Sequence, residues 1–162
     1  MSVLQANCRH PERCVVGHPF NPPYLIPLVE VVPGARTSPV VTDWVAEFYA
    51  STGKKPLKLS KEYPAFQANR LLEAVWREAL HLIDDGLATV EEIDVAMSYA
   101  PALRWAIMGP FMTYHLAGGE GGIAHFLDHF GPSLKYPWSY MIGPELTPAL
   151  RQQVIIPLIN SR

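Results

Sequence analysis

The chain carries a histidine and a glutamate whose surroundings could make them a proton-transfer pair. His18 follows an apolar run, residues 14–17, and opens the segment His-Pro-Phe-Asn-Pro. Glu30 lies inside Leu-Val-Glu-Val-Val at 28–32, a segment typical of a buried β-strand. A buried carboxylate is costly without a partner, and a histidine beside it could act as a general base whose charged form it stabilises. The alternative is a satisfied core glutamate beside an incidental histidine.

Two short strands must position this pair. Residues 14–17 and 28–32 are both β-type runs, and the loop between them holds four prolines. Proline lacks the N–H that a central strand donates, so the loop continues neither strand. We therefore predict two neighbouring strands that bring His18 and Glu30 within hydrogen-bond reach.

The same segments resemble a known family. His-Pro-Phe-Asn-Pro followed by Leu-Val-Glu-Val-Val is similar to the catalytic segment of the L-3-hydroxyacyl-CoA dehydrogenase family. The resemblance implies that His18 takes the proton of a 3-hydroxyl, that Glu30 orients and charges His18, and that a hydride passes to NAD. It also implies a substrate contact for Asn69, in Phe-Gln-Ala-Asn-Arg-Leu-Leu, which by itself would be a capping or surface residue.

Two later segments are similar to one branch of this family. Arg-Trp-Ala-Ile-Met-Gly-Pro-Phe at 104–111 and Leu-Ala-Gly-Gly-Glu-Gly-Gly at 116–122 resemble the branch of carnitine dehydrogenase and gulonate 3-dehydrogenase (lambda-crystallin). The implied reaction is NAD-dependent oxidation of a 3-hydroxyl to a 3-keto group in carnitine or a 3-hydroxyacyl-CoA, the latter in fatty acid metabolism. A trimethylammonium group would need aromatic faces, and for most of the candidates the alternative is a core or dimer contact. The candidates are Trp105, Phe111, Tyr114, Tyr136, Trp138 and Tyr140.

The residues before His18 differ from the family pattern. Only seventeen residues precede it, and they hold no strand, glycine-rich turn and helix in succession. In the family, this dinucleotide fingerprint and a serine that helps hold the substrate hydroxyl lie upstream of the histidine. We therefore expect the latter half of a longer enzyme, which by itself neither binds NAD well nor turns over substrate. The alternative is a non-catalytic dimerisation module or a truncated gene product.

The sequence predicts an α+β remnant followed by an all-α domain. Residues 1–62 would be the C-terminal part of a Rossmann-type NAD-binding domain, and residues 63–162 an all-α substrate and dimerisation domain. In the first domain, Ser38 or Thr42 caps a helix that Gly53 closes, and residues 54–60 form an edge strand with two leucines inward. The apolar face of that helix would consist of Trp44, Val45, Phe48 and Tyr49.

Capping and turn residues mark the helices of the second domain. Pro64 predicts the first turn of a long helix that stops at Gly86. Thr89 and Glu92 form a capping box, and Pro157 would end or kink the last helix, which begins at Thr147-Pro148. The stripe of the long helix comprises Leu72, Val75, Trp76, Ala79, Leu80 and Ile83, and that of the last helix Leu150, Val154, Ile155 and Leu158.

Composition limits the partners and the compartment. A net charge of −2 gives no electrostatic case for nucleic acid or an anionic membrane surface, and no apolar run reaches 18 residues. Two cysteines make no disulfide framework, which favours a reducing, cytoplasmic compartment. His125 and His129 could ligate a metal, but no glutamate follows the first as in zinc proteases, so we expect none. We expect a homodimer, because the family's helical domain forms dimers.

Overall fold

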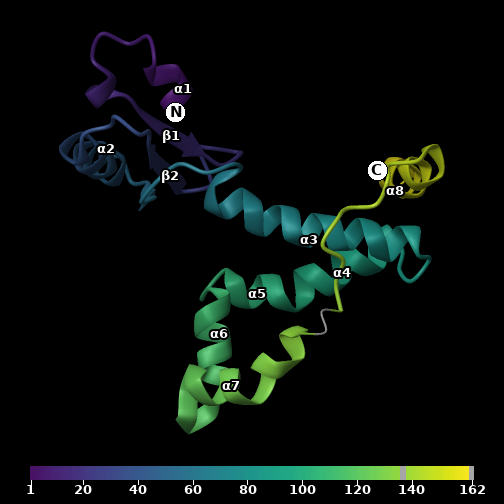
Figure 1. The fold of residues 1–162 in the computed structure, drawn as a ribbon. Helices are drawn as coiled ribbons and strands as arrows, with labels where there is room; N and C mark the ends of the chain where they lie inside the picture. The colour runs from purple at the N-terminus through teal and green to yellow at the C-terminus, as the bar shows by residue number, and fades with distance from the viewer. Residues whose placement is uncertain (136–137, 161–162) are drawn as a thin grey trace. The chain divides into compact units, whose positions relative to one another are not determined.

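The computed structural model describes residues 1–135 and 138–160 (Figure 1). It divides into two compact units, Met1–Leu72 and Glu73–Arg162. The first unit holds all three strands, and the second is helical, which confirms the predicted class of α+β followed by all-α. The boundary between the units lies later in the chain than the predicted domain boundary, because helix α3 (Phe66–Asp84) begins in the first unit and continues into the second.

The first unit is built on a three-stranded sheet of order β1-β2-β3. Strand β1 (Val15–Pro19) pairs antiparallel with β2 (Leu28–Pro33), which pairs parallel with β3 (Lys55–Lys58). The three predicted strands are therefore confirmed. Because β1 extends to Pro19, His18 lies within this strand and not beyond its end.

The core of the first unit is the central strand. Val29, Glu30, Val31 and Val32 of β2 are all buried, since β2 has a strand on either side. Helix α2 (Pro39–Ser51) packs against the sheet, with contacts to each of the three strands (Figure 1). This arrangement closes the strand that carries Glu30 away from solvent.

Helix α2 turns a different face inward from the one predicted. Thr42 and Ala46 are buried, whereas Trp44 and Phe48 are 61% and 50% exposed and stack on each other with ring centroids 5.8 Å apart. The inward face is therefore rotated, because the small side chains at 42 and 46 let the helix lie close to the sheet. The prediction that Trp44 and Phe48 face the core is wrong.

Helix α3 begins at Phe66, after a turn that contains Pro64. Ala65 and Phe66 have positive φ angles of 62° and 53°, so the chain cannot enter the helix at Pro64 as predicted. Within α3, Leu80 and Ile83 are buried. Leu72 and Trp76 are 62% and 51% exposed, so this part of the predicted stripe is uncovered.

The second unit consists of helices, of which the last two are separated by residues 131–147 and the others by short turns. They are α4 (Val90–Tyr99), α5 (Pro101–Trp105), α6 (Pro110–Ala117), α7 (Gly122–Phe130) and α8 (Pro148–Asn160). The capping box of α4 is confirmed: the Thr89 hydroxyl oxygen accepts from Glu92 N at 3.2 Å, and a Glu92 carboxylate oxygen accepts from Thr89 N at 2.8 Å.

Helix α8 runs through Pro157 to Asn160, so of the two effects predicted for the proline, an end or a kink, the end is excluded. Leu150 is fully buried, whereas Ile155 and Leu158 are 46% and 48% exposed, and the predicted inward stripe is therefore only partly inward.

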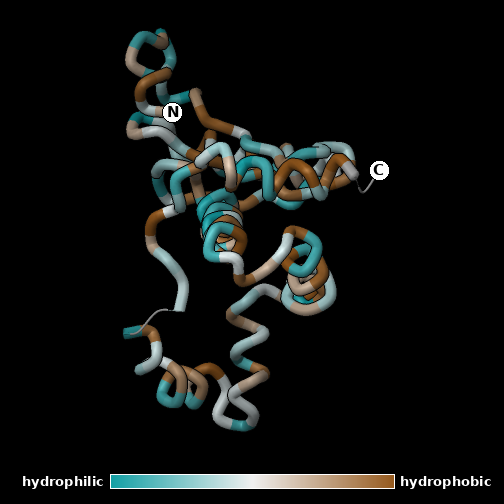
Figure 2. Tube along the Cα trace, turned by 90° about the vertical axis from the view of Figure 1, so that its right-hand side faces the viewer, coloured by the Kyte–Doolittle hydropathy of each residue, from teal (hydrophilic) through white to brown (hydrophobic). Residues whose placement is uncertain are grey.

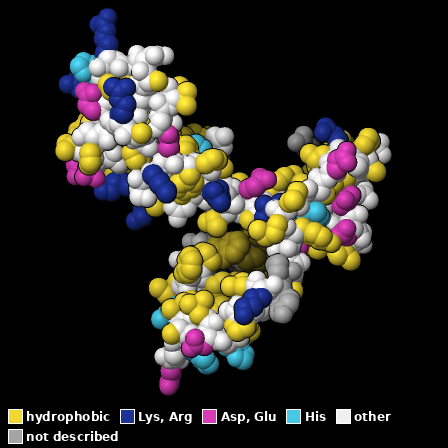
Figure 3. Space-filling view, viewed as in Figure 1, with side chains coloured by type: hydrophobic (Ala, Val, Ile, Leu, Met, Phe, Trp, Pro, Cys, Tyr) yellow, Lys and Arg dark blue, Asp and Glu magenta, His cyan; other side chains and the backbone are white. Residues whose placement is uncertain are grey.

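Hydrophobic side chains lie at the surface of the second unit. Figure 2 shows hydrophobic positions interspersed with polar ones along its helices, and Figure 3 shows hydrophobic side chains gathered on the visible face. Among the described residues of α4, α5 and α6, none is buried. In the part of the chain that the structure describes, no helix is long and apolar enough for a membrane span.

Candidate active site

The sheet register places the predicted proton-transfer pair face to face. His18 in β1 lies directly opposite Glu30 in β2. The imidazole Nδ1 and the carboxylate Oε2 are 2.9 Å apart, which confirms the predicted contact. The Glu30 side chain is fully buried, whereas 29% of the His18 side chain is exposed. The pair thus has one inaccessible member and one member that a substrate could reach.

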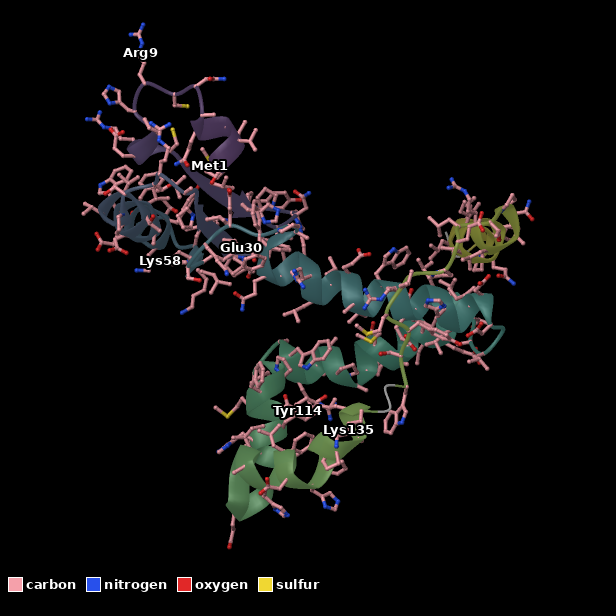
Figure 4. All side chains as sticks on the ribbon, viewed as in Figure 1. Met1, Arg9, Glu30, Lys58, Tyr114 and Lys135 are labelled. Atoms are coloured by element: carbon pink, nitrogen blue, oxygen red, sulfur yellow. The ribbon has the colours of Figure 1, made fainter. Side chains whose placement is uncertain are left out.

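The second carboxylate oxygen of Glu30 holds the start of helix α3. Oε1 accepts hydrogen bonds from the backbone N–H groups of Gln67 and Ala68, each at 2.9 Å. The first N–H groups of a helix have no partner inside it, and a negative charge at this end is favourable. Figure 4 shows Glu30 beside the beginning of α3. One carboxylate therefore joins β1, β2 and α3, a role that the sequence analysis did not predict.

The three contacts of Glu30 also fix what His18 can do. A carboxylate accepts hydrogen bonds without donating, so it can satisfy all three partners at once. The imidazole Nδ1 then donates to Oε2, which leaves the lone pair on Nε2 free. A histidine in this tautomer can accept a proton at Nε2, and the buried carboxylate stabilises the resulting positive charge.

Two aromatic rings flank the imidazole of His18. The Phe20 ring lies with its centroid 5.1 Å from that of the imidazole at 68°, and the Phe66 ring at 5.4 Å and 66°. Edge-to-face pairs of this geometry contribute about 0.5–1.5 kcal/mol each in proteins. Phe20 belongs to the predicted motif, but Phe66 is distant in sequence, and only the left-handed turn at Ala65 and Phe66 brings it here.

The loop between β1 and β2 is held at its base and open at its tip. Lys54 donates from Nζ to the carbonyl oxygens of Pro23 and Ile26, and Lys55 N donates to Pro27 O at 2.8 Å. Tyr24 and Leu25 at the tip are 82% and 70% exposed. Lys54 is therefore a loop anchor, which no sequence motif indicated.

Asn69 lies in the first turn of α3. It is half-buried and three residues after Phe66, so both lie on the same face of the helix. Among the contacts described for this chain, no hydrogen bond joins its side chain to His18 or Glu30. The structure therefore places Asn69 near the pair along the chain, and its role as a substrate contact stays a prediction.

The aromatic candidates of the second unit are largely exposed and paired with different neighbours. Tyr114 stacks on Phe126 with centroids 4.6 Å apart, whereas Tyr140 stacks on His81 at 4.0 Å. The Tyr140 hydroxyl donates to Asp85 at 3.0 Å, and this hydrogen bond to a carboxylate raises the pKa of Tyr140. Tyr136 lies outside the described residues. The exposed fractions of the others are 43% for Trp105, 81% for Phe111 and 94% for Trp138.

The two spaced histidines do not form a metal centre with other ligands. His125 donates from Nδ1 to Gly118 O at 3.1 Å, and its ring lies 6.4 Å from that of His129. Within residues 1–135 and 138–160, no three side chains of His, Cys, Asp or Glu are grouped so that they could hold a metal. His125 thus has a structural hydrogen bond across the α6–α7 connection.

Comparison with known sequences assigns the chain to a family. The model of the 3-hydroxyacyl-CoA dehydrogenase NAD binding domain matches residues 1–63, and the model of the family's C-terminal domain matches residues 66–143. The chain belongs to the 3-hydroxyacyl-CoA dehydrogenase family. The resemblance inferred from the His18 and Glu30 segments is confirmed. The prediction that NAD is the cofactor of this family is confirmed as well.

Curated relatives in this family are longer than the chain. The L-carnitine dehydrogenase of Nocardiopsis dassonvillei is 57% identical over 155 residues, which are 96% of this chain and 47% of the relative. That of Pseudomonas putida is 57% identical over 154 residues, 95% of this chain and 48% of the relative. The chain thus spans about half the length of the curated relatives it matches.

Solved structures of the family share the fold. One is a crystal structure of 5-formyl-3-hydroxy-2-methylpyridine 4-carboxylic acid 5-dehydrogenase, an NAD+ dependent dismutase, with a TM-score of 0.76 and 29% identity over 88% of this chain and 45% of that one. Another is 3-hydroxybutyryl-CoA dehydrogenase from Escherichia coli, with a TM-score of 0.59 and 29% identity over 80% of this chain and 27% of that one. The sequence and the fold of the chain therefore both agree with the 3-hydroxyacyl-CoA dehydrogenase family.

Proposed function

We propose that this chain carries the proton-transfer half of an NAD-dependent L-3-hydroxy-acid dehydrogenase. The observation that carries the proposal is the 2.9 Å contact between His18 Nδ1 and Oε2 of the fully buried Glu30 side chain. It leaves Nε2 as the only ring nitrogen that can take a proton, in a side chain that is 29% exposed. A base of this kind suits the oxidation of a secondary hydroxyl to a ketone.

The residues of the chain divide the proton chemistry between them. His18 Nε2 removes the proton from the substrate's 3-hydroxyl as the C–O bond gains double-bond character. Glu30 holds the tautomer and stabilises the imidazolium that forms, and Asn69 contacts the substrate from the same helix turn that Glu30 anchors. In a complete enzyme of the family, NAD would supply the hydride acceptor.

The described residues before His18 do not fit the pyrophosphate of that cofactor. They form the four-residue helix α1 (Ser2–Gln5) and a short 3₁₀ turn at Pro11–Arg13, with no strand before β1. No glycine precedes Gly17. Dinucleotide affinity in such folds comes from a glycine-rich turn that opens a helix, so this chain has the base but no cradle for the cofactor.

We propose carnitine as the substrate in preference to a 3-hydroxyacyl-CoA. The support is that several curated relatives more than half identical to the chain are named L-carnitine dehydrogenase.

The test uses the chain joined to a complete NAD binding domain of a curated relative. We expect turnover of carnitine and little of 3-hydroxybutyryl-CoA, and we expect His18→Gln to lower turnover by about 10²–10⁴ while NAD affinity stays nearly unchanged. His129→Gln, which changes an exposed histidine of the second unit, is the matched control. Full activity in His18→Gln would refute the base role, and preference for the acyl-CoA would refute the substrate.

A second candidate function is a non-catalytic dimerisation module. The observation that favours it is the exposed apolar surface of the second unit, since large patches of this kind mark interaction sites. We propose a homodimer in either case, and a cytoplasmic location for a chain with two free thiols, Cys8 and Cys14. Light scattering at micromolar concentration is expected to give twice the chain mass, and a clean monomer would contradict the dimer.

A further inference from the structure

The hydrogen bond to Glu30 alone does not hold the ring of His18 in one orientation. It sets the distance between Nδ1 and Oε2, but the two side-chain torsion angles of His18 can still change together while that distance is kept, which tilts the ring. Tilting moves Nε2, the atom that would meet the substrate hydroxyl, and misplacement of a reacting group by about 1 Å is enough to lose much of the rate. Something besides Glu30 must therefore set the plane of the ring.

The two rings beside His18 are in position to do this. Phe20 and Phe66 meet the imidazole at 5.1 and 5.4 Å with nearly equal interplanar angles of 68° and 66°. Phe20 follows the end of β1, two residues after His18, whereas Phe66 comes from the start of α3. Two rings from two different elements restrict a tilt that one hydrogen bond permits.

The turn before α3 exists at a conformational cost. Ala65 and Phe66 are the two non-glycine residues with positive φ in the described chain, at 62° and 53°. Left-handed backbone is unfavourable for residues with a Cβ, so something in the fold must maintain it. The N–H groups that follow, those of Gln67 and Ala68, both donate to Glu30, which holds the turn closed.

We propose that Phe66 is a positioning residue for His18, and that the left-handed turn at Ala65 and Phe66 places its ring against the imidazole. Glu30 then acts twice on the same base: it binds Nδ1 directly, and it anchors the turn that presents Phe66. This inference goes beyond the pair itself and rests on the proposed function of His18 as the base.

The test is nitrogen NMR of the histidine side chains in the 162-residue chain. The His18 signal is the one of six histidine signals that disappears in His18→Gln. In the unaltered chain we expect the Nδ1–H tautomer and nuclear Overhauser contacts from the imidazole protons to the Phe20 and Phe66 rings. Absence of the contacts to Phe66 would overturn the proposal without any variant.

Substitutions at 66 separate ring placement from general stability. In Phe66→Leu we expect the ratio of Glu30-bound to free imidazole to fall about twofold to tenfold. In Phe66→Tyr, which keeps an aromatic ring, we expect the same ratio as in the unaltered chain. Phe48→Leu removes an exposed aromatic ring of α2 and is the matched control, with no effect on His18. An unchanged His18 spectrum in a folded Phe66→Leu chain would overturn the proposal.

Substitutions at 65 test the turn while leaving the ring in place. Ala65→Gly is expected to keep the His18 spectrum, since glycine adopts positive φ freely, whereas Ala65→Val is expected to disturb it as Phe66→Leu does. Should Phe66→Leu fail to fold, these two variants and the contacts in the unaltered chain decide the matter. The spectra report on the ring and not on turnover, so this proposal and the proposed dehydrogenase activity can fail separately.

Discussion

Strand β2 and the helices α4–α6 differ in the burial of their apolar side chains. In β2, Val31 and Val32 are fully buried, because strands flank it on both sides and α2 packs on the sheet. In the helices, Leu103 and Phe111 are 59% and 81% exposed. Strand β2, which contains Glu30, is thus covered by residues of its own unit. The helical region displays a surface that a partner can cover, consistent with the proposed homodimer.

The largest expected effect tests how complete the first unit is. We expect no micromolar binding of NAD or NADH by the 162-residue chain, and no NAD reduction with carnitine, because no glycine-rich turn and helix precede the base. Isothermal titration calorimetry with and without carnitine measures this directly. Micromolar affinity would show that the cofactor binds to another part of the chain.

The next effect is that of Glu30→Gln on turnover, in the chain joined to a complete NAD binding domain. The amide oxygen can still accept from Gln67 N and Ala68 N, but the amide nitrogen donates to His18 and forces its proton onto Nε2. We expect turnover to fall by about 10²–10⁴ while the melting temperature changes little. Near-normal turnover would mean that the tautomer does not matter.

Removal of the same carboxylate is expected to cost stability in the first unit. Glu30→Ala leaves two N–H groups of α3 and the imidazole without their acceptor, so we expect a loss of about 3 kcal/mol in unfolding free energy. The control in the exposed helical region is Glu92→Ala, which removes half of a surface capping box and is expected to cost much less than Glu30→Ala. Urea unfolding measures both, and equal losses would remove the contrast between the two regions.

The smallest effect is a pH dependence confined to the helical region. Hydrogen bonds from the Thr89 backbone and hydroxyl hold the pKa of Glu92 below its ordinary value of 4.5. The unfolded chain therefore binds this proton first, and the stabilisation is complete above pH 4.5 and lost as the pH falls through the lowered pKa. Acid titration of helicity is expected to show a component that Glu92→Gln removes. A profile that is the same with and without Glu92 would contradict this.

The site was predictable where one residue pattern determined both partners. The apolar run around Glu30 and the prolines between the strands were enough to predict that His18 would face it, and the register confirms this. Phe66 and Lys54 could not be predicted, because each reaches the site through a turn whose geometry no short motif encodes. The family resemblance added the chemistry of His18, which spacing alone left open.

The errors about which helix faces are buried have one physical origin. Helical periodicity predicts which side chains share a face, but not whether another element covers that face. Leu72 and Trp76 share a stripe with Leu80, yet only Leu80 is buried. Likewise, Trp44 and Phe48 lose the inward position on α2 to Thr42 and Ala46, since small residues allow the closest approach to a sheet.

The double use of Glu30 affects how this chain would change if selection for activity were relaxed. The glutamate would still be needed to begin α3, so it would persist in a chain that no longer catalyses anything. His18 has one hydrogen-bond partner, lies partly at the surface and has no comparable structural duty. Substitutions would therefore accumulate at the histidine before the glutamate, so His18 is the better indicator of selection for the proposed proton transfer.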